Sequence, residues 1–396
     1  MTKQSVAILL GTRKGAFLLR SSAARERWRL EGPHFEGTEV NHLTLDARGE
    51  PTLYAAVNSP WWGSAVRMSA DLGRSWTEPE VGIRFPEGSA LTVAKLWQIT
   101  PGLASQPGTV YAGVDPAALF VSRDAGRTWA DVPALTSHST RAQWNPGAGG
   151  LMVHSIVPHP TDPSRMHIAI SAAGTFETSD GGATWEPRNR GALADFFPEP
   201  DQYPEVGQCV HHLEAHPQHP EVLYQQNHCG VYRSEDGGRD WTDISAGLPS
   251  RFGFPILVHP HRGDTIFAVP EQGAEMRAPV GARLAVYRSR DRGAKWKRIT
   301  KGSPVDAVLR ARQPAGVRRG QPRCAGPVPR HEHRAAVRQL RWRRLVVAAL
   351  GSAPADLLGG GGAGVSGVGA GHTLPGSVAL DIGRVVLSVG RTPLRQ

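Results

Sequence analysis

Residues 122–129 read SRDAGRTW, and near-copies of this octapeptide recur along most of the chain. The other clear copies are SADLGRSW (69–76), TSDGGATW (178–185), SEDGGRDW (234–241) and SRDRGAKW (289–296). A degenerate copy, SSAARERW, ends at Trp28, and successive tryptophans then stand 48, 53, 56, 56 and 55 residues apart. A motif S/T-x-D-x-G-x-x-W at so steady an interval indicates an internal structural repeat.

The motif has the chemistry of a tight β-hairpin turn. Its aspartate can accept hydrogen bonds from turn amides, and its glycine tolerates a positive φ. The tryptophan begins the next strand, where its ring can pack against the turn. The aspartate and tryptophan of each copy are therefore predicted to be structural: Asp71 and Trp76, Asp124 and Trp129, Asp180 and Trp185, Asp236 and Trp241, and Asp291 and Trp296.

Short apolar runs precede each copy of the motif. Before the copy at 122–129 they are ALFVS, then TVYAGV, and earlier still an inner run that contains WQIT. Each repeat thus has four short strands, A to D, in a meander. Repeated four-stranded meanders predict an all-β fold, a β-propeller.

The five motifs resemble the Asp-box (BNR) repeats of sialidase-like and sortilin-like propellers. Residues 1–303 are most similar to bacterial BNR-repeat proteins often described as glycosyl hydrolase-like or exo-sialidase-like. The resemblance implies that the Asp-box turns, between strands C and D, lie on one face of the ring. The B–C and D–A connections, and with them the functional site, are then expected on the opposite face.

Counting strands leaves the ring incomplete. Five repeats show all four strands, whereas the N-terminal residues supply only VAILLGT, AFLLRS and RWRLE, without an inner strand. A closed, seven-bladed ring would need one more blade and a closing inner strand from the C-terminal residues, because an open ring exposes strand edges. Residues 304–396 show neither pattern. The sequence therefore predicts five complete blades, a three-stranded N-terminal sheet and a disordered tail.

The composition changes near residue 304. Residues 304–396 hold 14 arginines, no lysine and four acidic residues, which accounts for the whole net charge of +10. The arginine-rich stretch RQLRWRRLVV occupies residues 338–347. With a suitable choice of synonymous codons, the DNA that encodes it also encodes Ala-Ser-Ser-Asp-Gly-Gly-Asp-Ser-Trp when it is read one base later. That would be an Asp box about one repeat after Trp296. We interpret the tail as a frameshifted blade; the alternatives are a genuine Arg/Gly-rich disordered segment and, less favoured, an element that binds nucleic acid or membrane.

Several classes of protein are disfavoured. The charge of residues 1–303 sums to zero, so no nucleic-acid partner is expected, and no apolar run has the length of a signal peptide or a membrane span. Three cysteines, Cys209, Cys229 and Cys324, make no disulfide framework. We expect a cytoplasmic monomer with buried thiols and no membrane partner.

The inner strands place candidate ligand residues around the axis. His154 and His211 stand five residues before the histidines of two HP dipeptides, and His42, Trp97 and Phe254 fill the matching position in the other blades. His42, His154 and His211 are predicted either to hold a divalent metal or only to line the pore. No other cofactor is implied. The ligand-binding candidates at this mouth are His42, Trp97, His154, His211, His228, Arg141 and Asn227. The HP histidines His159, His216 and His259 are expected to cap strand ends.

Two functions remain open. The favoured one is a scaffold that binds a small molecule, a glycan or a protein at the face opposite the Asp boxes. The alternative is a glycoside hydrolase or another hydrolase with its site at the mouth, with Tyr203, Glu205 and Asp115 as catalytic candidates. Resemblance to sialidases would imply an arginine triad, a tyrosine nucleophile with a glutamate partner and an early Phe/Tyr-Arg-Ile-Pro motif. That motif is not recognisable, so whether the protein is an enzyme stays open.

Overall fold

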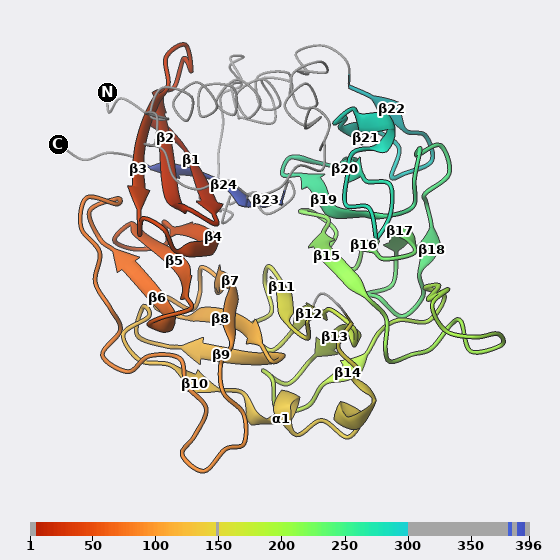
Figure 1. Cartoon of the computed structure of the whole chain (residues 1–396), viewed down its shortest axis with the longest axis horizontal. Helices are drawn as coiled ribbons and strands as arrows, with labels where there is room; N and C mark the ends of the chain where they lie inside the picture. Colours follow the sequence, from red (N-terminus) through yellow and green to blue (C-terminus); the bar gives the residue numbers. More distant parts are fainter. Residues whose placement is uncertain (1–4, 148–149, 300–378, 382–385, 393–396) are drawn as a thin grey trace, which may run out of the picture.

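The computed structural model describes residues 5–147, 150–299, 379–381 and 386–392. In these ranges six β-sheets surround a common axis (Figure 1), which confirms the all-β propeller. The helical segments that it describes are α1 (Pro133–Thr136), η1 (Arg141–Gln143) and η2 (Val280–Ala282). None of the helices in this part of the chain combines the length and apolarity that a membrane span requires.

The sheets follow one another as meanders, each running outward from the axis. We call them blade N and blades 1 to 5. Blade N contains β1 (Ser5–Thr12), β2 (Gly15–Ser22) and β3 (Arg29–His34), and blade 1 contains β4 (Glu39–Asp46), β5 (Thr52–Ser59) and β6 (Gly63–Ser69). Blade 2 contains β7 (Lys95–Pro101), β8 (Val110–Asp115), β9 (Ala118–Ser122) and β10 (Ala130–Asp131).

Blade 3 contains β11 (Val153–Pro158), β12 (Met166–Ile170), β13 (Gly174–Thr178) and β14 (Glu186–Pro187). Blade 4 contains β15 (Val210–Ala215), β16 (Leu223–Asn227), β17 (Gly230–Ser234) and β18 (Thr242–Asp243). Blade 5 contains β19 (Gly253–His259), β20 (Arg262–Pro270), β21 (Tyr287–Ser289) and β22 (Lys297–Arg298).

Blades 2 to 5 have the four predicted strands. In blade 1 the fourth strand is reduced to a single bridge between Met68 and Thr77. The core lies between neighbouring blades, where apolar side chains of one sheet pack against the next. Tyr54 of blade 1 and Phe120 of blade 2, for example, are fully buried in one such layer.

Blade N corrects the prediction of an N-terminal sheet without an inner partner. β24 (Val386–Thr392) pairs antiparallel with β1, and β23 (Ala379–Asp381) adds one further strand toward the axis. The segment VLSVGRT was overlooked because it lies within the Arg/Gly-rich tail. Physically, β1 presents a free row of backbone donors and acceptors, and a valine-containing extended segment is suited to pair with it.

The other predictions about the tail fall outside the described residues. These are the disorder, the further blade and the altered reading frame between residues 300 and 378. The division of the chain at residue 304 also remains a proposal, and sequencing of the gene through codons 310–350 tests the frame.

The Asp-box turns share one hydrogen-bond pattern. In blade 2, Asp124 Oδ1 accepts the Thr128 amide at 2.9 Å and the Ser122 hydroxyl at 2.8 Å, while Ser122 Oγ accepts the Gly126 amide. The same bonds form around Asp71, Asp180, Asp236 and Asp291. The Thr184 hydroxyl and amide, with Thr178, lower the pKa of Asp180 to about 2. The carboxylate therefore organises the turn in its ionised form.

In blades 4 and 5 the motif tryptophan joins its blade to the preceding one. Trp241 Nε1 donates to the carbonyl of Arg188 at 2.9 Å, and Trp296 Nε1 donates to that of Ile244 at 2.7 Å. Each acceptor belongs to the preceding blade. The conspicuous residues of the repeat thus fix the scaffold on one face and leave the other face to the loops.

Candidate functional site

The B–C turns and D–A connections meet at the face opposite the Asp-box turns. We call this the loop face. It carries the β5–β6 turn, the β8–β9 turn, the β16–β17 turn and the long segment between β14 and β15. The inner strands β4, β7, β11, β15 and β19 stand next to one another around the axis (Figure 1).

Each inner strand has a register shift near its loop-face end. The residues skipped by the pairing are Asn41, Trp97, His154 and His211, and in blade 5 the irregularity spans Phe254. This corrects the predicted alignment of His42, because Asn41 is the blade 1 equivalent of His154 and His211. The bulge occupies the same place in each of these strands, but blade 1 has no HP dipeptide to fix the count, so His42 was placed one position too early.

The bulged side chains connect one blade to the next. Asn41 Nδ2 donates to Leu96 O at 3.0 Å, His154 Nε2 to Val210 O at 2.6 Å, and His211 Nδ1 to Gly253 O at 2.6 Å. Each acceptor lies just before the bulge of the following inner strand.

The residue after the bulge makes the reciprocal contact. His42 Nδ1 accepts the Ile99 amide at 3.4 Å, Ser155 Oγ accepts the Leu213 amide at 3.1 Å, and His212 Nδ1 accepts the Ile256 amide at 3.3 Å. Together the two positions form an interblade clamp that satisfies backbone groups at the ring's centre.

These contacts argue against a metal held by His42, His154 and His211. Burial lowers the pKa of His42 and of His154 to about 3, and that of His211 to about 4, so all three are neutral near pH 7. Neutral imidazoles are ligand-competent, but within the described residues these three do not form a group with ligand atoms within 4.8 Å of one another. The geometry of the described residues therefore favours the alternative that these histidines line the pore, because they bond to adjacent blades.

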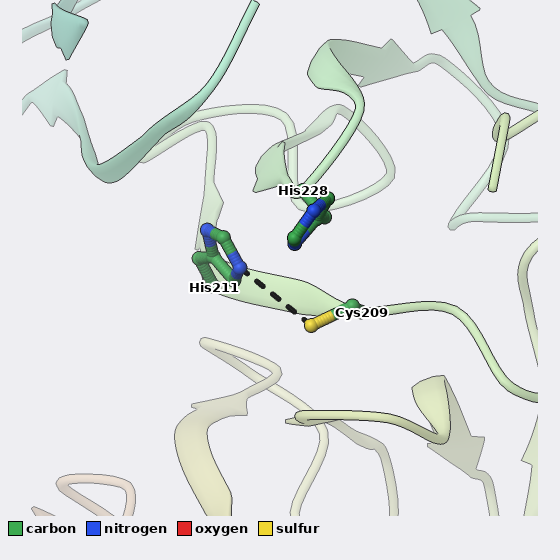
Figure 2. A group of neighbouring side chains, drawn as sticks. All are labelled: Cys209, His211 and His228. Atoms are coloured by element: carbon green, nitrogen blue, oxygen red, sulfur yellow. Dashed lines mark hydrogen bonds between the residues drawn. The ribbon is translucent and has the colours of Figure 1, made fainter. Parts of the chain in front are cut away.

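His211 instead lies beside Cys209 and His228 (Figure 2). Its Nε2 is 3.6 Å from Cys209 Sγ, and the His228 amide donates to Cys209 O at 2.9 Å. Cys209 is partly accessible rather than buried as expected, whereas Cys229 is buried and donates its thiol to Asp195 Oδ1 at 3.0 Å. Both thiols are free.

The remaining ligand candidates mostly support the fold. Asn227 is fully buried and donates to Gln208 Oε1 at 3.2 Å. The Arg141 guanidinium lies 4.8 Å from the Trp144 ring centre and donates to the carbonyl of Ala117. Trp97 is half-buried at the bulge of β7.

The three catalytic candidates come from two parts of the loop face. Tyr203, which is 61 % exposed, and Glu205 lie in the segment between blades 3 and 4. Glu205 Oε1 accepts the Asn189 amide at 2.9 Å, which orders that segment. Asp115 ends β8 in blade 2, and burial raises the pKa of its carboxyl above the ordinary value despite nearby Lys95.

Two exposed tryptophans on the loop face were missed by the sequence reasoning. Trp61 and Trp62 are 84 % and 87 % exposed in the β5–β6 turn, where Ser59 Oγ accepts both of their amides. The next strand is tied to blade 2 by the Ser64 hydroxyl, which donates to Ala94 O at 3.2 Å. These tryptophans could have been identified from the sequence, because two adjacent aromatic residues lie in a predicted turn, outside the alternating pattern of the strands.

A carboxylate–lysine cluster adjoins this turn. Lys95 Nζ lies 2.7 Å from Glu39 Oε2, and the Ala94 amide donates to Asp115 O at 2.8 Å. Lys95 is also opposite Asp115 in the β7–β8 pairing. One ammonium group therefore acts on two carboxylates, and Glu39 pairs with Asn58, just before the turn that carries the two tryptophans.

The HP histidines lie at the other face. Their Nδ1 atoms accept amides two or three residues on, from Asp162 to His159, from Gln218 to His216 and from His261 to His259, each at 3.1 Å. This confirms that they cap strand ends. His216 also borders a cavity of about 530 Å³ on the Asp-box side.

Two curated proteins are similar in sequence to part of this chain. The chain is 24 % identical over 228 residues to a probable oligoxyloglucan-reducing end-specific xyloglucanase of Neosartorya fischeri, and 26 % identical over 160 residues to such an enzyme of Emericella nidulans. These matches cover 54 % and 39 % of this chain but only 25 % and 18 % of the relatives. No protein-family model matches the chain.

Solved structures show the same fold. The xyloglucanase of family GH74 from Xanthomonas campestris superposes with a TM-score of 0.52 at 16 % identity, covering 76 % of this chain and 44 % of that one. The GH74 enzyme of Niastella koreensis gives 0.50 at 19 % identity, covering 73 % and 42 %. The chain is thus a β-propeller with a distant relationship to the GH74 xyloglucanases.

Proposed function

We propose that the protein is a glycoside hydrolase-like propeller that binds and cleaves a xyloglucan-type polysaccharide on its loop face. The observation that carries the proposal is that adjacent blades present two exposed tryptophans, Trp61 and Trp62, and a cluster of Glu39, Lys95 and Asp115 on the same face. Glu39 pairs with Asn58, just before the turn that carries the tryptophans. The distant relationship to xyloglucanases supports the substrate class.

The tryptophan pair suits a sugar chain. A solvent-exposed indole is costly in water unless it is covered by a ligand, and its flat face accommodates the apolar C–H face of a pyranose ring. Two adjacent indoles in one turn can contact successive sugar units. The Ser59 hydroxyl, which accepts both tryptophan amides, holds the turn that presents them.

The two carboxylates suit glycosidic bond cleavage. In this reaction one carboxyl group protonates the leaving oxygen while the other acts as base or nucleophile. Asp115 has the raised pKa that a general acid needs. Glu39 forms a salt bridge with Lys95, and it would serve as the ionised partner. Lys95 places one positive charge beside the Glu39 carboxylate.

Sugar release and polysaccharide binding test the proposal separately. We expect the full chain to release reducing ends from xyloglucan and not from a fluorogenic sialoside. Asp115→Asn should abolish release and preserve binding in affinity electrophoresis. The double variant Trp61→Ala/Trp62→Ala should weaken binding about tenfold, equivalent to about 1.4 kcal/mol. Trp28→Ala, in the degenerate motif copy, is the matched aromatic control.

A binding scaffold is the second candidate. It is favoured by the many loop-face residues, such as Asn227 and Arg141, that are engaged in structural contacts. Xyloglucan binding that depends on the tryptophans, without any release of reducing ends, would establish it instead. Absence of both binding and release would exclude the two functions for this polysaccharide.

A further inference from the structure

We propose that Cys209, His211 and His228 form a zinc site at the loop-face end of blade 4, with a fourth coordination position open to a water or a substrate group. Cys209 and His211 come from the start of β15, and His228 from the β16–β17 turn. The site is separate from the carboxylate cluster on blades 1 and 2, and does not depend on the proposed hydrolase activity.

The ligand atoms have the spacing that a tetrahedral zinc ion needs. All three lie within 4.8 Å of one another, and His211 Nε2 is 3.6 Å from Cys209 Sγ. With Zn–N and Zn–S bonds of roughly 2.0 and 2.3 Å, a tetrahedron has N–S edges of about 3.5 Å, close to the observed separation. Figure 2 shows the three side chains pointing toward a common space. Rotation of side chains alone can complete the site.

Hydrogen bonding orients the central ligand. His211 Nδ1 donates its proton to Gly253 O at 2.6 Å, which leaves the Nε2 lone pair facing the thiol. This arrangement, in which the second ring nitrogen donates to a carbonyl, is the usual support for a metal-bound histidine. The ring of His228 has no hydrogen-bond partner within the described residues, so coordination would break none.

The charge states suit metal binding near neutral pH. Burial lowers the pKa of both His211 and His228, so both imidazoles are unprotonated. Burial raises the pKa of the Cys209 thiol, and a hydrogen bond to Ala172 together with nearby Arg277 partly offsets this. Zinc would therefore displace a thiol proton when it binds.

Aromatic rings enclose the group. The His211 ring stacks on Phe254 with 4.7 Å between centres, and Phe196 meets the His228 ring edge-on at 5.5 Å. Phe252 contacts both histidines. This apolar wall with two nitrogen donors and one sulfur donor favours zinc or copper(I) over calcium or magnesium, which prefer oxygen ligands. We commit to zinc because CysHis2 with one open position is a tetrahedral donor set of the kind zinc enzymes use.

Cys229 provides a matched control. It lies in the same blade and is also a free thiol, but its thiol donates to Asp195 and it is outside the group. The experiment uses the full chain carrying Cys324→Ser, so that the two described thiols are the only ones. Cys209→Ser and His228→Gln are each compared with Cys229→Ser.

Cobalt(II) and zinc are the probes. We expect one equivalent of cobalt to bind and give a thiolate-to-cobalt charge-transfer band, which zinc abolishes by competition. Cys209→Ser should remove the band, and His228→Gln should weaken zinc binding at least about tenfold, whereas Cys229→Ser should change neither. Circular dichroism checks that each variant is folded.

Three results would overturn the inference. They are a band that survives Cys209→Ser in folded protein, equal losses in Cys209→Ser and Cys229→Ser, and binding of copper(I) without binding of zinc. A wild-type chain that binds neither cobalt nor zinc would also overturn it, because the thiol–imidazole contact would then be only a hydrogen bond.

Discussion

His154 in blade 3 donates its Nε2 proton to the carbonyl of Val210 in blade 4, with 2.6 Å between the two atoms. The adjacent Ser155 hydroxyl accepts the Leu213 amide of the same strand. Two consecutive side chains therefore satisfy a donor and an acceptor of the next inner strand. This clamp therefore joins the inner strands of blades 3 and 4 beside the pore.

His154→Ala should destabilise the protein. The substitution leaves the buried Val210 carbonyl without its partner, which costs about 1–3 kcal/mol. Urea unfolding followed by tryptophan fluorescence measures the change. His219→Ala, a substitution of an exposed histidine on the Asp-box side, is the control and should be nearly neutral. Equal stability of the two variants would contradict the clamp.

The clamp also predicts loss of stability in mild acid. Burial lowers the pKa of His42 and His154 from 6.5 to about 3, and that of His211 and His212 to about 4. The unfolded chain therefore binds more protons than the folded one between these values and pH 6.5. Stability should be greatest above pH 6.5 and fall as the pH is lowered toward 3.

One residue near these histidines acts in the opposite sense. Desolvation raises the pKa of Glu214 to about 8, so this group favours the folded state less as the pH rises from about 4.5 to 8. Urea unfolding across pH 4 to 8 should therefore be done in a Glu214→Gln background. If the free energy of unfolding of the Glu214→Gln variant does not change between pH 7 and pH 5, the clamp histidines do not have the lowered pKa values that the prediction requires.

Much of the scaffold followed from the sequence because its determinants are local. The aspartate, the glycine and the tryptophan of each Asp box lie within eight residues of one another, so the motif alone is enough to predict the turn. The strand runs before Trp129 and Trp241 correspond to β7–β9 and β15–β17. By contrast, β24 pairs with β1 across nearly the whole chain, and nothing local announces that contact.

The site was harder to predict because it depends on register. Asn41, not His42, takes the bulge position that His154 and His211 occupy in their strands. The bonds of His154 and His211 to the next blade are likewise not visible in residue spacing. The sequence also gave no reason to combine His211 with Cys209 and His228, which meet only through the β15–β16 pairing. Trp61 and Trp62, in contrast, were visible and were overlooked.

Gly126→Ala tests the Asp-box turn as a contact between blades. Gly126 has a φ of +89°, and an added Cβ would stand 2.8 Å from both Met68 Sδ and Tyr54 Cε1 of blade 1. The backbone strain and the steric overlap together should lower the free energy of unfolding by about 1–3 kcal/mol. Gly82→Ala, which meets nothing within 4 Å, is the matched control. A thermal melt in which both variants unfold with the wild type would show that the turn is not packed against blade 1.

Closure of blade N by β24 can be tested at the backbone. Ser388 is paired with Leu9 of β1 on one side and with Ala379 of β23 on the other. Proline at this central position removes an amide donor and fits poorly within a paired strand, so Ser388→Pro should uncouple β24 and expose the edge of β1. Because a free strand edge recruits other chains, the variant should unfold at a lower temperature and associate at concentrations where the wild type does not. Ser388→Thr keeps the amide and should behave as the wild type in calorimetry and in size-exclusion chromatography. If Ser388→Pro matches Ser388→Thr in both measurements, β1 does not depend on β24 and the N-terminal sheet is closed in some other way.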